Sequence, residues 1–270
     1  MKLGANTKCF GGRTVRETAE LFAACDLNCA ELCFCQSDLS GWRYNFCGKL
    51  ALPELREVSS AVRIFSEYGI EVSTIGIYNC LWSGTSSEIF DSLTSFVQYC
   101  DLSAECGIKN VTTCAGTASR MPRSQSFDNA LMKKLRESFL YCLIEAEKRG
   151  LTVSLECADG DALKSYEDYL SLKEYTENAI GKSSMLKYIS SPGFESKNVS
   201  ASEIGIYHIK DRKKDSVYYG RFGEGDADFS AFAKGLEKNL ETPIILEYVN
   251  SENLRDTVTS FTDFVGGGKY

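Results

Sequence analysis

The sequence predicts an α/β protein that forms a single (β/α)8 (TIM) barrel over residues 1–270. Eight short β-type runs alternate with longer segments of helical periodicity, which is typical of βαβ units around a parallel sheet. Three helical segments end on a glycine directly before the next strand, as helices in αβ loops commonly do. No linker-like change of composition interrupts the alternation. An open doubly wound sheet is the alternative, but no glycine-rich nucleotide fingerprint follows the first strand.

The β-type runs are short and rich in apolar residues. In chain order they cover residues 2–6, 29–33, 71–77, 110–114, 152–156, 185–189, 204–209 and 244–248. Helical periodicity covers residues 15–24, 55–68, 89–106 and 131–148, with Gly69, Gly107 and Gly150 closing the last three of these segments. The connection between the sixth and seventh runs is short, which predicts a reduced sixth helix. We expect Asp228 and Ser251 to cap the last two helices.

Composition and charge argue against several classes of protein. A formal net charge of −7, with no basic stretch beyond residues 212–214, argues against binding to a nucleic-acid backbone. No apolar run approaches the roughly 20 residues that a membrane helix needs. The first residues turn polar too early for a signal peptide. We therefore expect a cytoplasmic protein with neither a nucleic acid nor a membrane as partner.

Twelve cysteines suggest metal or disulfide chemistry, but their spacing supports neither. Cys25, Cys29, Cys33 and Cys35 cluster across a helix end and a strand, without the paired C-x2-C knuckles of a zinc ribbon. Disulfides are not expected in a protein without an export signal. We interpret the cysteines as small core hydrophobes.

Polar side chains at strand ends are the candidates for chemistry. Alternation along the strands puts Glu156, His208 (the only histidine) and Glu247 at the inward-facing C-terminal ends of their strands, where barrel enzymes keep their active sites. Two carboxylates and one imidazole indicate an acid–base site or a site for Mn²⁺, Mg²⁺ or Co²⁺. The alternative is that the glutamates merely pair with barrel lysines such as Lys187.

Three further residues are expected at a substrate. Trp42 follows the second strand on a loop and can cover a ligand, or it packs on its own barrel. Lys210 can hold an anionic or hydroxyl group, or it is a solvated charge at the strand end. Glu31 can hydrogen-bond a hydroxyl, or it pairs with a basic neighbour. Polar groups beside an aromatic surface are typical of a pocket for a small carbohydrate or its phosphate.

At these residues the sequence resembles the sugar phosphate isomerase/epimerase family, the xylose-isomerase-like barrels. The resemblance is carried by Cys-Ala-Glu31-Leu, Ser-Leu-Glu156, His208-Ile-Lys-Asp211, Gly223-Glu-Gly-Asp-Ala-Asp-Phe229 and Leu-Glu247-Tyr. These motifs follow the family's order over nearly the whole chain. Their most specific part is the H-x-K-D, G-E-G-x-x-D-F and L-E-Y series.

The resemblance implies a divalent-metal site and a reaction. Glu156, His208 and Glu247 match three of the family's four metal ligands, and Asp211 is expected to orient His208. After the sixth strand the family typically has Asp-Pro-x-Asn, whereas this chain has Ser190-Ser191-Pro-Gly. The resemblance therefore implies that Ser191 replaces an aspartate ligand. A neutral hydroxyl is a poor ligand for a hard cation, and we expect the metal to bind weakly or to be absent.

The implied activity is sugar isomerisation or epimerisation by proton transfer next to a carbonyl, with metal assistance. Glu156 and Glu247 would be the two carboxylates that remove and return the proton. The missing aspartate leaves two alternatives open. One is a catalytically degenerate barrel that binds a sugar or a protein partner. The other is an inosose-type dehydratase, which would use the same residues.

Overall fold

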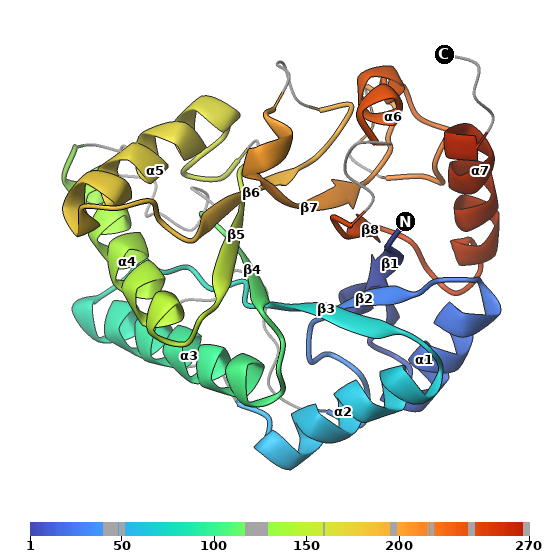
Figure 1. The fold of residues 1–270 in the computed structure, drawn as a ribbon, viewed down its shortest axis with the longest axis horizontal. Coiled ribbons are helices and arrows are strands. Elements are labelled where there is room, and N and C mark those ends of the chain that lie inside the picture. The colour runs from blue at the N-terminus through green and yellow to red at the C-terminus, as the bar shows by residue number, and fades with distance from the viewer. Residues whose placement is uncertain are drawn as a thin grey trace. The chain divides into compact units, whose positions relative to one another are not determined.

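The computed structural model describes residues 1–39, 48, 52–116, 129–158, 160–194, 199–214, 216, 219–236 and 241–266. Eight parallel strands follow one another around a closed barrel in the order β1 to β8, which confirms the predicted fold class (Figure 1). The strands are β1 (Leu3–Asn6), β2 (Cys29–Leu32), β3 (Glu71–Gly76), β4 (Asn110–Cys114), β5 (Thr152–Glu156), β6 (Leu186–Ser190), β7 (Ile204–Ile209) and β8 (Ile244–Leu246). Each strand boundary lies within two residues of its prediction.

The helices follow the strands as expected. They are α1 (Val15–Ala24), α2 (Leu55–Glu67), α3 (Ser86–Glu105), α4 (Asn129–Lys148), α5 (Tyr166–Ile180), α6 (Ser230–Leu236) and α7 (Leu254–Gly266), with 3-10 turns η1 (Thr7–Phe10) and η3 (Ala201–Glu203). Among the described residues between β6 and β7, η3 is the only helical element, so the sixth helix is reduced as predicted.

The predicted caps are confirmed with one correction. Gly69, Gly107 and Gly150 all have positive φ, and the residue after each donates its amide hydrogen to a carbonyl five residues back, as in a Schellman cap. Asp228 accepts a hydrogen bond from the amide of Ser230 at the start of α6. The prediction of Ser251 as the cap of α7 was wrong, because the side chain of Asn250 accepts from the amides of residues 252 and 253 instead.

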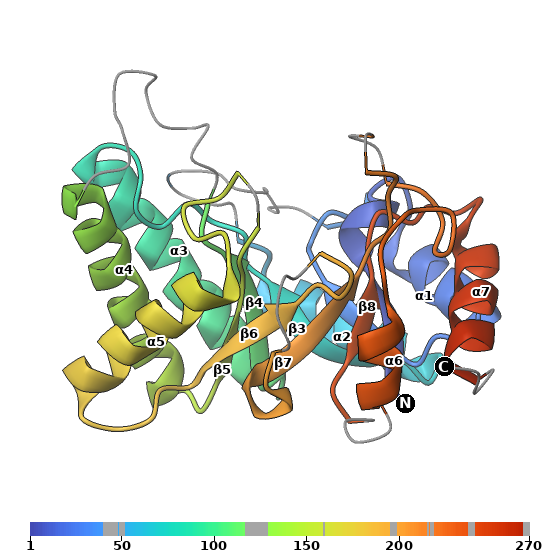
Figure 2. The ribbon, with the colours of Figure 1, turned by 90° about the horizontal axis from the view of Figure 1, so that it is seen from above.

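The chain divides into two compact units, and the single domain over residues 1–270 stays a prediction. The first unit comprises residues 1–39, 59–73 and 190–270. In it, β7, β8, β1 and β2 pair in parallel in that order. The guanidinium of Arg255 in α7 donates to the carbonyl of Ala24 at the end of α1, and these helices lie side by side in Figures 1 and 2. Aromatic rings, among them Phe10, Phe22 and Phe65, fill the core of this unit.

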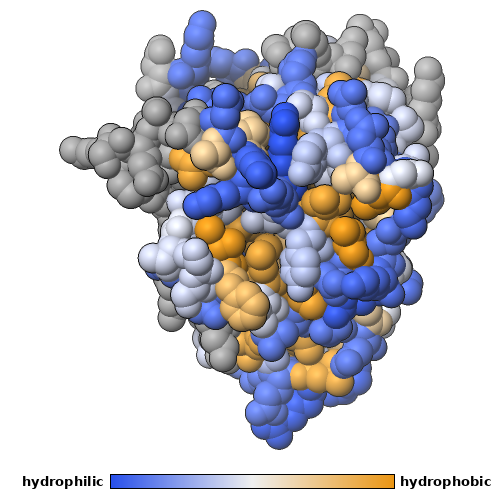
Figure 3. All heavy atoms as spheres, turned by 90° about the vertical axis from the view of Figure 1, so that its left-hand side faces the viewer, coloured by the Kyte–Doolittle hydropathy of each residue, from blue (hydrophilic) through white to orange (hydrophobic). Residues whose placement is uncertain are grey.

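The second unit comprises residues 40–58 and 74–189. Its strands β3 to β6 pair in parallel, and α3, α4 and α5 lie next to one another on their outer side (Figure 2). Exposed apolar side chains such as Phe90 and Tyr141 occur among hydrophilic ones, and Figure 3 shows apolar patches interleaved with polar residues on one face. Among the described residues, no helix has the length and apolar character needed to cross a membrane.

Candidate functional site

Three buried ionisable side chains of the first unit come together where their strands end. Glu31 lies in β2, His208 lies in β7, and Glu247 follows the last residue of β8. Strand pairing sets their positions, because Glu31 is in register with Asn6 of β1 and His208 is in register with Ile245 of β8. Each is at most 3% exposed, so their mutual contacts are little screened by water.

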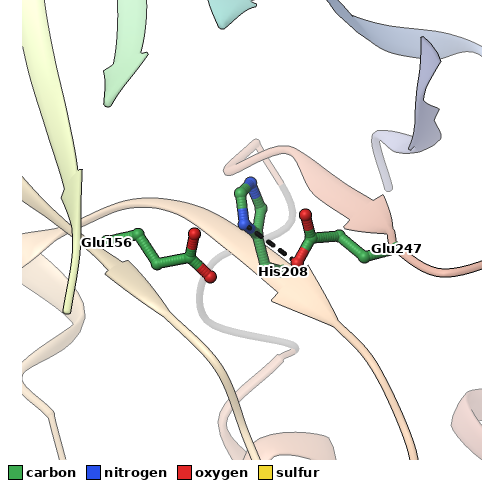
Figure 4. Close-up of side chains that lie close together, drawn as sticks. All are labelled: Glu156, His208 and Glu247. Carbon is green, nitrogen blue, oxygen red and sulfur yellow. Dashed lines mark ion pairs between the residues drawn. The ribbon is translucent and has the colours of Figure 1, made fainter. Parts of the chain in front are cut away.

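His208 has a different carboxylate at each ring nitrogen. Its Nε2 lies 3.0 Å from Oε2 of Glu31, which also accepts a hydrogen bond of 2.9 Å from Nδ2 of Asn6. Its Nδ1 lies 3.5 Å from Oε2 of Glu247, the ion pair marked in Figure 4. Because an ionised carboxylate only accepts hydrogen bonds, Glu31 favours the tautomer with the proton on Nε2. In the neutral ring this leaves the lone pair of Nδ1 on the side of Glu247, as in metal-binding histidines held by a carboxylate.

Two lysine ammonium groups contact the carboxylate of Glu247. Nζ of Lys210 lies 3.3 Å from its Oε2. Nζ of Lys8, in η1, lies 2.5 Å from its Oε1. The sequence left open the alternative that the glutamates pair with lysines, and Glu247 does so, with Lys8 and Lys210. Lys8 was missed by the sequence analysis, although it lies only two residues after the end of the first strand, and strand ends identified the other candidates.

Glu156 and Ser191 lie at the ends of the strands predicted to carry them. Glu156 is the last residue of β5 and is 5% exposed; Ser191 directly follows β6 and is 8% exposed. Figure 4 shows the side chains of Glu156, His208 and Glu247. His208 and Glu247 offer an imidazole nitrogen and a carboxylate oxygen in the first unit, and Glu156 offers a carboxylate oxygen in the second; each is a possible metal ligand. The roles of all the predicted site residues stay predictions.

An aromatic surface adjoins Glu247. The ring of Tyr248 is stacked on that of Tyr219 at 3.8 Å between centroids, and Nζ of Lys8 lies 5.6 Å from the centre of the Tyr248 ring. Tyr248 is 44% exposed and has a φ of 56°, a left-handed conformation that is uncommon for a bulky residue. Burial of its hydroxyl, followed by the charge of Glu247, raises the pKa of Tyr248 to about 12. Trp42, the aromatic residue predicted to cover a substrate, lies outside the described residues.

Asp211 holds a loop, and this corrects its expected role. Its Oδ2 accepts hydrogen bonds from the amides of Gly223 and Gly225 at 2.9 and 3.0 Å, and its Oδ1 accepts one from Ala227 at 3.4 Å. A Cβ atom on Gly225 would overlap the carboxylate of Asp211, so the close approach requires glycine. The Gly-Glu-Gly motif thus wraps around the carboxylate of Asp211. The side chain that orients His208 is Glu31.

The described cysteines are mostly buried. The described cysteines are thiols rather than disulfides, and none belongs to a candidate metal-holding group within the described part of the chain. Burial raises the pKa of Cys29 to about 12, and burial followed by the charge of Glu31 raises the pKa of Cys33 well above its ordinary value. Neutral thiols are poor metal ligands.

Comparison with known proteins identifies the family. A family model described as xylose isomerase-like TIM barrel matches residues 19–261. The chain belongs to this family. The family assignment agrees with the resemblance seen in the motifs around Glu156, His208 and Glu247. No curated protein matches the chain by sequence.

Solved structures with the same fold include proteins that act on sugars. An IolI protein with a bound zinc atom superimposes with a TM-score of 0.73 at 14% identity, covering 100% of this chain and 99% of that one. The apo 3-keto-D-glucoside 4-epimerase YcjR of E. coli gives a TM-score of 0.71 at 15% identity, with 96% and 98% covered. A D-psicose 3-epimerase crystallised with D-fructose gives 0.69 at 13% identity, with 99% and 100% covered. At these identities the likeness establishes the fold.

Proposed function

We propose that this protein is a carbohydrate isomerase or epimerase that moves a proton at a carbon next to a carbonyl group. The observation that carries the proposal is the buried chain of contacts from Glu31 through His208 to Glu247, at the strand ends where barrel enzymes place their chemistry. Sugar epimerases among the proteins of the same fold support the substrate class.

The two carboxylates suit the proton transfers. In our proposal, one of Glu156 and Glu247 takes the proton from the carbon beside the carbonyl, and the electron pair of that C–H bond forms an enediolate. In an epimerisation the other glutamic acid returns a proton to the opposite face of the same carbon, so that atoms and charge balance. In an isomerisation the proton goes to the neighbouring carbon, and a hydroxyl proton also moves from one substrate oxygen to the other. Such carboxylates act from either side of the substrate carbon. Lys210, beside Glu247, is placed in the proposal to hold a hydroxyl or phosphate oxygen.

The donor set fits a divalent cation. Glu156, His208 and Glu247 would hold it, and Glu31, at Nε2 of His208, favours the tautomer that has its lone pair on Nδ1. When bound, such a cation stabilises negative charge that develops on the substrate's oxygens. Zinc is bound in the structure of the IolI protein, whereas Mn²⁺, Mg²⁺ and Co²⁺ are the ions that we expect here from the oxygen-rich ligands.

The aromatic surface supports a sugar ligand. Tyr219 and Tyr248 form a stacked pair beside Glu247, and sugar sites commonly combine such rings with a few polar groups. We propose that these tyrosines supply the stacking surface first assigned to Trp42, whose part in substrate binding stays a prediction.

Deuterium exchange tests the proposal directly. The purified protein is incubated in D₂O with Mn²⁺ and a panel of ketoses, aldoses, inososes and their phosphates, and the products are analysed by NMR. We expect one sugar to gain deuterium next to its carbonyl with the wild type, and none to do so with Glu156→Gln or Glu247→Gln. Retained exchange in a folded Glu156→Gln variant would contradict the assignment of Glu156.

Two other functions have distinct outcomes in the same experiment. A sugar-binding barrel without catalysis is favoured by Ser191, which replaces a carboxylate by a neutral hydroxyl; it would show thermal shifts with a sugar but no deuterium uptake. An inosose dehydratase would give a product that lacks one water. Neither a thermal shift nor exchange with any sugar of the panel, with or without Mn²⁺, would count heavily against a sugar pocket.

A further inference from the structure

The ammonium group of Lys8 contacts Glu247, one of the candidate metal ligands. Its ammonium lies 2.5 Å from Oε1 of Glu247, which is only 1% exposed, and the lysine side chain itself is 16% exposed. A contact of this length between opposite charges, shielded from water, is a strong ion pair.

The position of Lys8 is built into the first unit. The side chain of Asn6 caps η1 by accepting a hydrogen bond of 2.9 Å from the amide of Lys8. The same side chain donates through Nδ2 to Glu31, which holds His208. Asn6 therefore ties the backbone of Lys8 to the pair that orients the imidazole. The Tyr248 ring, 5.6 Å from Nζ, provides a second favourable surface for the ammonium.

A metal bound to Glu247 would meet this ammonium at the same carboxylate. Lys8 contacts Oε1 and Lys210 contacts Oε2, so both oxygens of Glu247 already have a cationic neighbour. A divalent ion at this carboxylate must displace an ammonium or remain beside it, and like charges a few ångströms apart repel strongly where water is excluded. Replacement of an aspartate by Ser191 acts in the same direction, because it removes negative charge that would favour the metal.

We propose that Lys8 is a resident cation that competes with a divalent metal for Glu247 and so sets the metal affinity of the site. This inference rests on the proposed function only in taking Glu247 as a metal ligand, and it requires no turnover. In the absence of metal, Lys8 neutralises the buried carboxylate. Metal binding is then an exchange of one cation for another, and the site is loaded only at high metal concentration.

Titration of the metal-stripped protein with Mn²⁺ alone, followed by calorimetry and by the EPR signal of free Mn²⁺, tests this inference. Lys8→Met removes the charge and keeps most of the side-chain volume. We expect it to bind Mn²⁺ about tenfold or more tightly than the wild type, as for loss of one close competing charge. The matched control is Lys2→Met, which removes an equal charge from an exposed pair with Glu71 and should leave Mn²⁺ affinity unchanged.

Two further variants keep the test decisive. Lys8→Gln replaces Lys8→Met if the latter fails to fold, and circular dichroism checks both. Ser191→Asp should tighten binding separately, and Ser191→Asp with Lys8→Met should bind more tightly than either alone. Equal or weaker Mn²⁺ binding by both folded Lys8 variants, or no binding by any variant, would overturn the inference. The Mn²⁺ titration contains no sugar, so a failure of the deuterium-exchange experiment would contradict the proposed function but not the role of Lys8. Conversely, tighter Mn²⁺ binding by Lys8→Met would support the role of Lys8 without deciding whether the protein turns over a sugar.

Discussion

At the scale of single residues, His208 illustrates how a buried group acquires a defined chemical state. Glu31 and Glu247 face its two nitrogens, but only Glu31 is at hydrogen-bond distance, at 3.0 Å against 3.5 Å. The shorter contact selects the nitrogen that carries the proton, and the other nitrogen faces Glu247. Glu31 was expected at the substrate; its contacts with Asn6 and His208 give it an orienting role, and its substrate role stays a prediction.

The thiols predict a pH dependence of stability. Cys100 in α3 and Cys142 in α4 are buried, and burial raises the pKa of Cys100 to about 12 and the pKa of Cys142 well above its ordinary value. In the unfolded chain both titrate near about pH 8.5. Above that pH the unfolded state loses protons that the folded state keeps, so the free energy of unfolding falls as pH rises from about 8 to about 10.

Urea denaturation in a reducing buffer measures this slope. Replacement of both cysteines by alanine should lower stability at every pH, because cavities form, and should make the alkaline slope shallower than in the wild type. An unchanged slope in the double variant would mean that other groups cause the alkaline loss.

At the scale of elements, the loop after β7 shows how a short motif is held by one carboxylate. Asp211 comes directly after Lys210, and three amides of residues 223–227 converge on its two oxygens. This arrangement fixes the loop to the end of the strand that carries His208. The H-x-K-D and G-E-G motifs, separate in the sequence, are therefore one structural unit.

Asp211→Asn tests that unit. The variant keeps the size of the side chain but replaces one acceptor oxygen by an amide group that faces amide donors. We expect the free energy of unfolding to fall by about 1–3 kcal/mol. Hydrogen exchange should also accelerate at Gly223 and Gly225. Asp226→Asn is the matched control, since the Asp226 carboxylate bonds the amide of Lys214 in an exposed position, and it should change little. Equal exchange rates in the two variants would rule out Asp211 as the anchor.

At the scale of the whole molecule, strand periodicity was a reliable guide and side-chain contacts were not. All eight strands were predicted within two residues at each end, because apolar runs between glycine-capped helices leave little choice of boundary. Lys8 was missed because its partner Glu247 is 239 residues away, and no local pattern links them. Asp211 was expected to orient His208 because the two residues are close in the sequence. Its carboxylate instead accepts hydrogen bonds from backbone amides of residues 223–227, which the local sequence does not reveal.

Barrel closure at β1 gives the last prediction. Gly4 is in register with Cys29 of β2 and with Ile245 of β8, so it lies where the chain's first strand joins its last. A Cβ atom at Gly4 would overlap the backbone carbonyl and Sγ of Cys29, and backbone in a paired strand cannot move aside cheaply. We expect Gly4→Ala to lower the free energy of unfolding by about 1–3 kcal/mol, as overpacking does.

Gly12→Ala provides the control, because a methyl group at Gly12 would meet no heavy atom within 4 Å, and its effect should stay within about 0.5 kcal/mol. Urea denaturation followed by circular dichroism compares the two variants with the wild type. Wild-type stability in Gly4→Ala would show that β1 and β2 do not approach as closely as their register requires. A loss of stability in Gly4→Ala but not in Gly12→Ala would show that the strands at Gly4 pack too closely to accept a methyl group.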